Sequence, residues 1–257
     1  MIGATILIDP SPQGSEAWHA IRRGRITASR FKDARDRLKG GGWSQKALGY
    51  AYDVARQRVG GKTPEVFSNQ YMRAGTEAEP VARIKYEGLR SVMVEEVGFH
   101  YTADGKFGCS PDGLIRPGGV WECKAMVSSA TLFAALVSGD ITEFRDQCIG
   151  ELWLTHSDWV DLTLYCPDLE LIRVIRIERD ESEIDALVED LMKFDALVET
   201  LAQRLREAIE LFGMPGLPLG DDEPAEEVPA PVAAAPAPKV EPRVAVRPDD
   251  LATADLF

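Results

Sequence analysis

The sequence predicts an α/β fold in which a central mixed β-sheet is flanked by helices. Two changes in hydrophobic period carry this prediction. Apolar side chains recur at helical spacing up to residue 86, and from residue 91 they begin to alternate as they do in strands. A second alternating block at 159–179 is followed by a long amphipathic stretch at 181–212. This order of elements is typical of a mixed sheet covered by helices.

The first third of the chain is expected to be helical after an irregular or edge-strand start over residues 1–13. Ser15 is expected to cap a short helix that Gly24 ends, and Thr27 or Ser29 to cap the next one. Gly75 or Pro80 is expected to bend or divide the fourth helix. The expected helices cover residues 16–22, 30–39, 44–59 and 68–86, and the third is expected to bury Leu48, Tyr52 and Ala55.

The remaining elements follow from alternation and from turn residues. Pro167 and Asp168 are expected to join two strands as a hairpin, and Gly213 is expected to stop the last helix. The expected strands are residues 91–99, 107–109, 119–124, 159–166 and 170–179, and the expected helices are 129–137, 143–155 and 181–212.

The composition changes after residue 213. Nine of the 16 prolines lie between Pro215 and Pro248, among Ala, Glu and Val. Such a segment buries too little apolar surface to offset its ordering entropy. We therefore expect a folded domain over 1–213 and a disordered, acidic Pro/Ala-rich tail over 214–257. The tail ends in an acidic stretch with an apolar tip at Phe257, which either docks a partner or only aids solubility.

Cysteine, histidine and hydropathy patterns exclude several classes. The four cysteines are scattered without a CxxC pair, so they are expected to be reduced thiols and not ligands of an iron–sulfur cluster. The three histidines show no zinc-binding spacing. With no membrane-spanning run and no apolar leader, the expected location is the cytoplasm, in a bacterial host.

The net charge of −13 is unevenly distributed. From Glu178 onward there are 20 acidic and 7 basic residues, which by themselves give −13. The first 177 residues hold 22 of each sign, and their N-terminal part is basic. Twelve basic residues there face only four acidic ones; the basic residues are Arg22, Arg23, Arg25, Arg30, Lys32, Arg35, Arg37, Lys39, Lys46, Arg56, Arg58 and Lys62. A local basic patch of this kind suits phosphate binding.

The stretch from Phe107 to Met126 brings two carboxylates close to a lysine. Asp112 lies in a Ser-Pro-Asp-Gly turn, and Glu122 and Lys124 lie on a strand that follows a second turn. Side chains alternate along a strand, so Glu122 and Lys124 point to one face and Trp121 and Cys123 to the other. Two carboxylates suit Mg²⁺ or Mn²⁺, and the lysine can orient water or stabilise negative charge. The alternative is an ordinary hairpin with a solvated salt bridge.

Two further blocks contain polar residues that suit a phosphodiester substrate. The segment 14–29 places Arg22 near a helix start at Thr27 or Ser29, and arginine, hydroxyls and helix amides form phosphate sites. In the segment 147–155, Gln147 shares a helix with core-like residues. The alternatives are an arginine and a glutamine on solvated helix faces.

The order of four motifs resembles the λ-exonuclease family, also called the YqaJ-type viral recombinase nucleases, which carry the PD-(D/E)xK pattern. The motifs are GSEAWHAIRRGRITAS, AGTEAEPVARIKYE, GCSPDGLI with GGVWECKAM, and RDQCIGELWLT. The match covers roughly residues 13–180. It implies a restriction-endonuclease-like α/β core over the domain at 1–213.

The resemblance also implies roles for individual residues. Asp112, Glu122, the backbone carbonyl of Cys123, and Glu79 (with Glu77 as an alternative) match the family's metal ligands. Lys124 matches the catalytic lysine, and Gln147 matches the glutamine that positions the attacking water. Arg22 and Ser29 match the residues that bind the 5′-phosphate. One departure is Ile149, where relatives often have a second glutamine, which leaves Gln147 alone in its role.

As a family member, the chain is expected to be a Mg²⁺-dependent 5′→3′ exonuclease, with Mn²⁺ as a substitute. It would degrade one strand of linear double-stranded DNA and expose 3′ single strands for phage-type recombination. The implied partners are DNA ends, a single-strand annealing or single-strand-binding protein, and further copies of the chain in a trimer. The alternative activity is that of a structure-specific or restriction-like endonuclease of the same fold.

Overall fold

A computed structural model describes residues 5–62, 70–126 and 128–213 of this chain, with the side chains of 70–76 left out. The tail expected over 214–257 lies outside these residues, as does the expected helix start at residues 68 and 69. No helix in the described ranges combines the length and the apolar character needed to cross a membrane.

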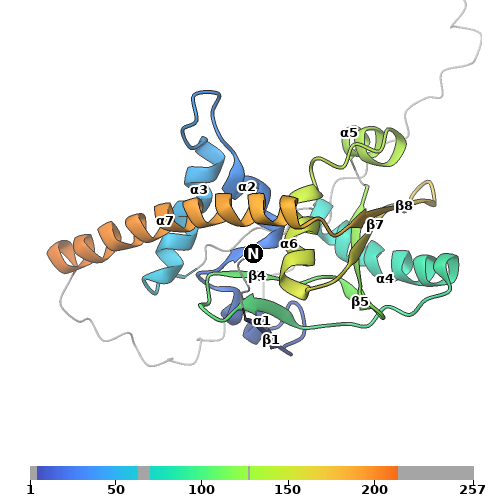
Figure 1. Ribbon diagram of the computed structural model, residues 1–257, viewed down its shortest axis with the longest axis horizontal. Helices are drawn as coiled ribbons and strands as arrows, with labels where there is room; N and C mark the ends of the chain where they lie inside the picture. Colours follow the sequence, from blue (N-terminus) through green and yellow to red (C-terminus); the bar gives the residue numbers. More distant parts are fainter. Residues whose placement is uncertain (1–4, 63–69, 127, 214–257) are drawn as a thin grey trace, which may run out of the picture. The chain divides into compact units, whose positions relative to one another are not determined.

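The strands of the described chain form two four-stranded sheets with helices around them, so the α/β class predicted from the sequence is confirmed (Figure 1). The first sheet has the order β1-β3-β4-β2 and contains both parallel and antiparallel pairs. Its strands are β1 (Ile6–Asp9), β3 (Phe99–Thr102), β4 (Phe107–Cys109) and β2 (Ile26–Thr27). The N-terminal segment thus supplies an edge strand, which is one of its two expected states.

The second sheet holds the predicted hairpin and has the order β5-β6-β7-β8. The strands β6 and β7 are parallel, and the other two pairs are antiparallel. Its strands are β5 (Gly113–Ile115), β6 (Gly119–Ala125), β7 (Trp159–Cys166) and β8 (Leu171–Glu178). The sequence did not predict β5, a three-residue strand paired with the start of β6.

The helices before the second sheet agree with the sequence in number and order. Ser15 caps α1 by accepting a hydrogen bond from the amide of Trp18 at 3.2 Å, and Ser44 caps α3 by accepting one from Ala47 at 3.1 Å. These elements are α1 (Glu16–Arg22), the 3₁₀ turn η1 (Ala28–Arg30), α2 (Phe31–Arg35), α3 (Gln45–Arg58) and α4 (Gln70–Arg90). The helix α4 continues through Pro80 without a break.

The helix expected over 30–39 ends at Arg35, four residues early. The chain turns back after Asp36, and Arg37 pairs with Trp43 in an isolated β-bridge. The Arg37 guanidinium lies 3.0 Å from the centroid of the Trp43 ring. The expected side-chain caps are also wrong, because Thr27 makes no capping hydrogen bond and Ser29 lies within η1.

The strand expected over 91–99 is wrong except at Phe99. Residues after α4 form a connection whose backbone is held by α4 side chains: Glu87 accepts a hydrogen bond from the amide of Val94 at 2.8 Å, and Arg83 donates to the Val94 carbonyl. Val94 is buried against α4, and the pairing of the segment 91–98 with a strand is limited to an isolated β-bridge between Glu95 and Leu114 of β5.

The buried face of α3 differs from the expected one. Tyr52 is 55% exposed, whereas Tyr50 is buried; the buried residues of α3 are Ala47, Tyr50, Ala51, Val54 and Ala55. The Tyr50 ring stacks on Phe194 with centroids 5.4 Å apart, and its hydroxyl accepts a hydrogen bond from the Thr27 amide at 2.9 Å. These tertiary contacts set the rotation of the helix.

The long helix α7 (Glu181–Phe212) packs its first two thirds on α2, α3 and α6 (Arg145–Thr155). Its apolar stripe is buried as far as Ala202, and beyond that point Ile209 is 52% exposed. Asp195, also buried, pairs with Arg58 at 2.6 Å and with Lys106 at 2.8 Å. A buried carboxylate held by two cations ties α7 to α3 and to the loop before β4.

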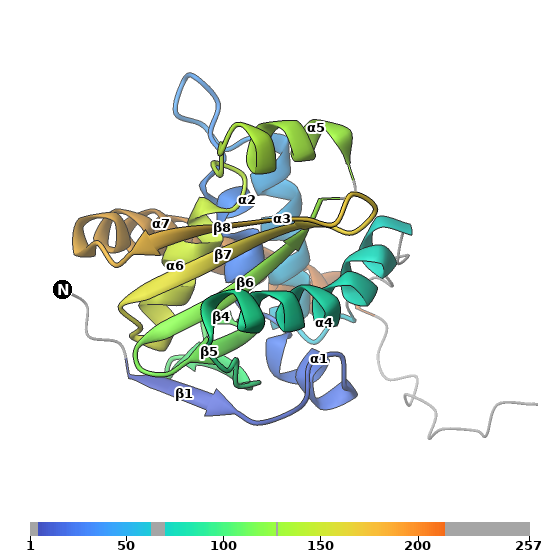
Figure 2. The same cartoon turned by 90° about the vertical axis from the view of Figure 1, so that its right-hand side faces the viewer.

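The two faces of the second sheet are covered by different helices (Figure 2). On one face Trp121 and Tyr165 pack against Tyr86 of α4. On the other face Leu162 and Leu164 pack into the main core with Cys148 and Leu152 of α6, next to α5 (Ser129–Thr131) and the π-helical turn η2 (Leu132–Val137). Alternation along β6 therefore directs Glu122 and Lys124 toward the α6 side.

Candidate active site

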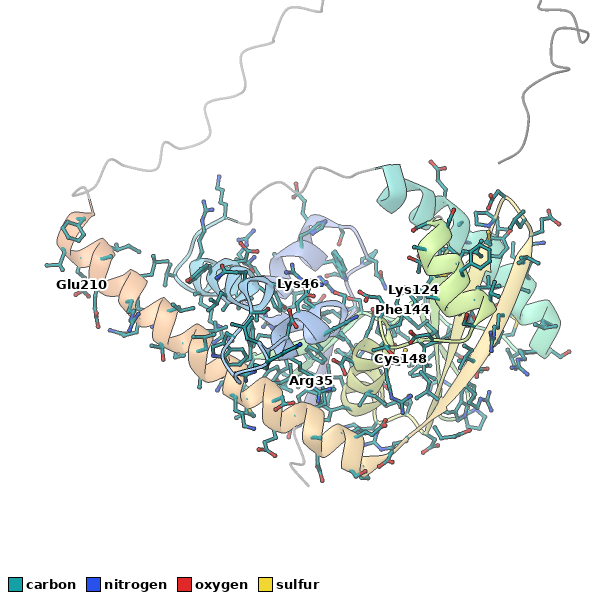
Figure 3. All side chains as sticks on the ribbon, turned by 90° about the horizontal axis from the view of Figure 1, so that it is seen from above. Arg35, Lys46, Lys124, Phe144, Cys148 and Glu210 are labelled. Carbon is teal, nitrogen blue, oxygen red and sulfur yellow. The ribbon has the colours of Figure 1, made fainter. Side chains whose placement is uncertain are left out.

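A cavity of about 200 Å³ lies where α1, η1, the turn before β5, β6 and α6 meet. It brings together six residues that the sequence analysis had selected from three separate segments. The lining is Gln13, Trp18, Arg22, Ala28, Ser29, Ser110, Asp112, Glu122, Lys124, Gln147 and Glu151. Figure 3 marks Lys124 on β6 and Cys148 on α6, the two elements that face each other at this site.

Asp112 is held by the strand beside it. Its Oδ2 accepts a hydrogen bond from the backbone amide of Cys123 at 2.8 Å, which ties the Ser-Pro-Asp-Gly turn to the middle of β6. Burial and the nearby charge of Glu122 raise the pKa of the Asp112 carboxyl well above its usual range. A buried carboxyl group beside a second carboxylate favours a cation next to it.

Glu122 is the centre of the polar contacts. Its Oε1 accepts from Lys124 Nζ at 2.7 Å and from Gln147 Nε2 at 2.5 Å. Glu122 is only 1% exposed, so the alternative of a solvated salt bridge is wrong. Burial lowers the pKa of Lys124, but attraction from Glu122 and Asp112 outweighs burial, and the pKa is raised. The lysine is therefore an ammonium in this arrangement.

Glu151 is a cavity residue that the sequence analysis did not select. It lies one helical turn after Gln147 on α6, and its Oε1 accepts a hydrogen bond from Gln147 Nε2 at 2.9 Å. Burial and the nearby Glu122 raise the pKa of the Glu151 carboxyl well above its usual range. The i, i+4 spacing from Gln147 was the available signal, because it places both side chains on one helix face.

Arg22, at the end of α1, lines the same cavity. Its guanidinium stacks 4.1 Å from the centroid of the Trp18 ring and donates from Nη1 to Ser110 Oγ at 3.0 Å. Trp18 Nε1 donates to the same oxygen at 2.9 Å. Burial lowers the pKa of the Arg22 guanidinium, and no carboxylate in the described part of the chain forms an ion pair with it. A half-buried cation of this kind favours an anionic ligand.

The remaining candidates lie at or beyond the cavity edge. Ser29 is exposed but lines the cavity from η1. Glu79 of α4 does not line it, although burial and the charge of Glu122 raise the pKa of its carboxyl. Glu77, the alternative, is exposed. The Cys123 thiol is half-buried, and burial together with Asp112 raises its pKa, so it stays protonated.

The residues present fit a hard divalent cation. Glu122 Oε2 is buried and has no hydrogen-bond partner among the described residues, which leaves a carboxylate oxygen next to the cavity that Asp112 also lines. Oxygen ligands of this kind suit Mg²⁺, which also keeps waters and substrate phosphate in its shell. Over residues 5–62, 70–126 and 128–213 no group of three or more acidic, cysteine or histidine side chains is arranged to hold a metal ion without further ligands.

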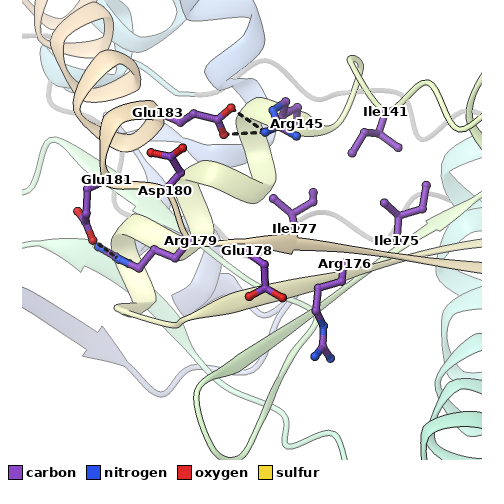
Figure 4. Close-up of a pocket in the computed structure, with 10 residues that line it drawn as sticks. All are labelled: Ile141, Arg145, Ile175, Arg176, Ile177, Glu178, Arg179, Asp180, Glu181 and Glu183. Carbon is purple, nitrogen blue, oxygen red and sulfur yellow. Dashed lines mark hydrogen bonds and ion pairs between the residues drawn. The ribbon is translucent and has the colours of Figure 1, made fainter.

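A larger surface pocket of about 570 Å³ lies elsewhere, between the start of α6, β8 and the start of α7 (Figure 4). Its charged side chains are largely paired with one another, as in the bidentate contact of Arg145 with Glu183 at 2.7 and 2.8 Å. It contains none of the selected residues. The smaller cavity is the better candidate because the carboxylates, lysine and arginine converge there.

Five of the twelve basic residues in the segment 22–62 form ion pairs with carboxylates in the fold. Asp33 pairs with both Arg30 and Lys46, and Arg35 pairs with Asp146 at 2.6 Å. The basic residues in ion pairs are Arg30, Lys32, Arg35, Lys46 and Arg58. Of the twelve basic residues, Arg22 is the one that lines the cavity, so it is the candidate phosphate contact.

Comparisons with known proteins show the family and the fold of this chain. A family model of the YqaJ-like viral recombinase domain matches residues 17–158. The chain is similar to the crystal structure of an alkaline exonuclease, LHK-Exo, from Laribacter hongkongensis, with 31% identity and a TM-score of 0.67 over 77% of this chain and 100% of that one. The structure of LHK-Exo in complex with dAMP matches with 31% identity, the same coverage and a TM-score of 0.66.

A phage-related exonuclease from Haemophilus somnus 129PT shares the fold, with 14% identity and a TM-score of 0.56 over 72% of this chain and 96% of that one. A search of curated proteins found no match. The fold and the carboxylate–lysine site define a nuclease-type α/β domain. The chain belongs to the YqaJ-like viral recombinase family, so the resemblance inferred from the four motifs is confirmed.

Proposed function

We propose that this chain is a Mg²⁺-dependent 5′→3′ exonuclease that degrades one strand of linear double-stranded DNA. The exonuclease class has the support of the 31% identity to an alkaline exonuclease over that protein's whole length. The nucleotide complex of the same relative supports DNA as the substrate class. The 5′→3′ direction of degradation is proposed from the residues of the candidate active site.

One observation carries the proposal. The carboxylates and lysine suited to hydrolysis and the arginine suited to an anion line the same cavity of about 200 Å³. A site with only Asp112, Glu122 and Lys124 suits any phosphodiester. Adding Arg22 and Ser29 supplies a second anion contact in the same cavity. Such a contact favours cleavage near a terminal phosphate.

We assign each residue of the site a role from its chemistry. Asp112, Glu122 and the Cys123 carbonyl would hold Mg²⁺, and the family resemblance adds Glu79, which lies outside the cavity lining. The ion would supply Lewis-acid chemistry at the scissile phosphate. The Lys124 ammonium donates to a phosphate oxygen and stabilises the charge that develops there. The Gln147 carboxamide holds the attacking water in line. Arg22 and Ser29 hold the 5′-terminal phosphate and set the position of the first bond.

The test is digestion of end-labelled linear duplex with and without a 5′-phosphate, in Mg²⁺ and in Ca²⁺. We expect label release from the 5′-phosphorylated end in Mg²⁺, slower release from a 5′-hydroxyl end, and none in Ca²⁺ or EDTA. Release that begins at the 3′ end would contradict the proposed direction, and full activity in EDTA would contradict the metal requirement.

The second candidate is an endonuclease of the same fold, favoured only by the carboxylate–lysine set, which endonucleases also use. A covalently closed circular duplex separates the two. An exonuclease leaves the circle intact for as long as it takes to consume the linear form. Cleavage of the circle at a comparable rate would replace the proposed exonuclease with this alternative.

We further propose that the enzyme acts in the cytoplasm of a bacterial host, as a trimer, and supplies 3′ single strands to an annealing or single-strand-binding protein. The support is membership of a viral recombinase family. Sedimentation velocity tests the trimer, and a monomer at all concentrations would reject it. Pull-down of such a partner with and without residues 248–257 tests the tail, and equal recovery would reject its role.

A further inference from the structure

Glu151 is a buried carboxyl group within the fourth motif, and neither the family resemblance nor the proposed mechanism gives it a role. It is 0% exposed and lies on α6 among core residues such as Leu152 and Leu154. Its Oε2 has no hydrogen-bond partner among the described residues. Burying a carboxyl group with an unpartnered oxygen is costly, so a purely structural role would be served better by an apolar side chain.

Its side chain accepts a hydrogen bond from the glutamine of the site, and the Glu122 carboxyl lies beside it. Gln147 Nε2 donates at 2.5 Å to Glu122 Oε1 and at 2.9 Å to Glu151 Oε1. A carboxamide has two N–H donors on one end and a single acceptor oxygen on the other. Both donors are therefore directed at carboxyl oxygens, one on β6 and one on α6.

This pair of contacts decides which end of the carboxamide faces the cavity. A rotation of 180° would turn Gln147 Oε1 toward Glu122 Oε1, where lone pairs would repel. The observed orientation leaves Oε1 without a hydrogen bond among the described residues, on a side chain that lines the cavity. With Glu122 alone, the second N–H would lose its partner and the orientation would be held less firmly.

We propose that Glu151 is a positioning residue that fixes the Gln147 carboxamide so that its Oε1 accepts a hydrogen bond from the attacking water. The inference rests on the proposed hydrolytic function and deepens it. Glu151 does not touch the substrate; it acts through Gln147.

The first experiment is a double-mutant cycle on hydrolysis of linear duplex. We expect Glu151→Leu to lower kcat about tenfold with little change in KM for DNA ends, because water positioning acts on the chemical step. In a Gln147→Ala background the same substitution should change kcat less than about twofold, since the group it positions is gone. Glu151→Gln, which keeps an acceptor oxygen, should stay within about threefold of wild type.

Asp195→Ala is the matched control. It also removes a buried carboxylate, from the pair with Arg58 and Lys106, and should lower the melting temperature while leaving kcat unchanged. Wild-type kcat in Glu151→Leu, or an additive loss in the double variant, would overturn the positioning role. So would an equal loss of kcat in Glu151→Gln and Glu151→Leu.

The second experiment needs no activity. In metal-free protein labelled with ¹⁵N-glutamine, the Gln147 side-chain amide is assigned by its absence in Gln147→Ala. Glu151→Leu should shift one of its two amide protons and speed its exchange with water, whereas Glu151→Gln should not. An unchanged Gln147 signal in Glu151→Leu overturns the inference even if the enzyme proves not to be an exonuclease, so the two failures are distinguishable.

Discussion

We expect Lys124→Ala to reduce the rate of digestion of linear duplex by about 10²–10³-fold, the loss typical of removing one charge-stabilising donor. Lys124 Nζ lies 2.7 Å from Glu122 Oε1, on the face of β6 that borders the cavity. No other lysine lines that cavity. An alanine at this position leaves developing negative charge on the phosphate without its nearest protein cation. The measurement is kcat/KM on 5′-phosphorylated linear DNA in Mg²⁺.

The matched control is Lys193→Ala. Lys193 lies on α7 and pairs with Glu189 at 2.8 Å, with its side chain 53% exposed. This variant should digest DNA as the wild type does. DNA binding in Ca²⁺ and the melting temperature of Lys124→Ala should be measured alongside, because a misfolded variant would also lose activity. A folded Lys124→Ala enzyme with wild-type kcat/KM would remove this lysine from the mechanism.

The elements that the sequence predicted well are those whose signals are local. The hairpin of β7 and β8 follows from strict alternation around Pro167, and the helix α7 follows from a regular 3.6-residue period closed by Gly213. Ser15 caps its helix as predicted because a serine hydroxyl reaches amides only two or three residues away. No distant contact is needed for any of these features.

The errors arise where a distant contact overrides the local signal. The rotation of α3 is set by Tyr50, whose ring meets Phe194 and whose hydroxyl meets the Thr27 amide. The segment at 91–98 alternates like a strand, yet side chains of α4 satisfy its backbone at Val94. Hydrophobic periodicity carries no information about either of these contact partners.

In the candidate active site, too, local signals were predictable and distant contacts were not. Asp112, Glu122 and Lys124 lie within 13 consecutive residues, so strand alternation alone placed two of them on one face. Arg22 and Gln147 came together with them only through the order of motifs. Glu151 escaped notice because a glutamate in a helix is usually solvated, and only the fold shows it at 0% exposure against Gln147. These residues, distant in the sequence, come together because α1 and α6 pack on the sheets.

The second large effect concerns the DNA end. We expect Arg22→Ala to reduce the preference for 5′-phosphorylated over 5′-hydroxyl ends by about 10–100-fold, because a charge-assisted contact contributes about 1.5–3 kcal/mol. The guanidinium is held by the Trp18 ring at 4.1 Å and by Ser110 Oγ at 3.0 Å, and it has no carboxylate partner in the described residues. Its charge is therefore available to a phosphate. The measurement is the ratio of initial rates on the two kinds of end.

Arg23 supplies the control one residue away. It is exposed at the end of α1, so Arg23→Ala should keep the wild-type ratio while losing the same formal charge. Arg22→Lys should recover only part of the preference, because an ammonium cannot present the planar fork of a guanidinium. An unchanged ratio in Arg22→Ala would show that the end is recognised elsewhere, and the cavity would then account for hydrolysis but not for the starting point. A lowered ratio in Arg23→Ala as well would assign the effect to general charge and not to the Arg22 contact.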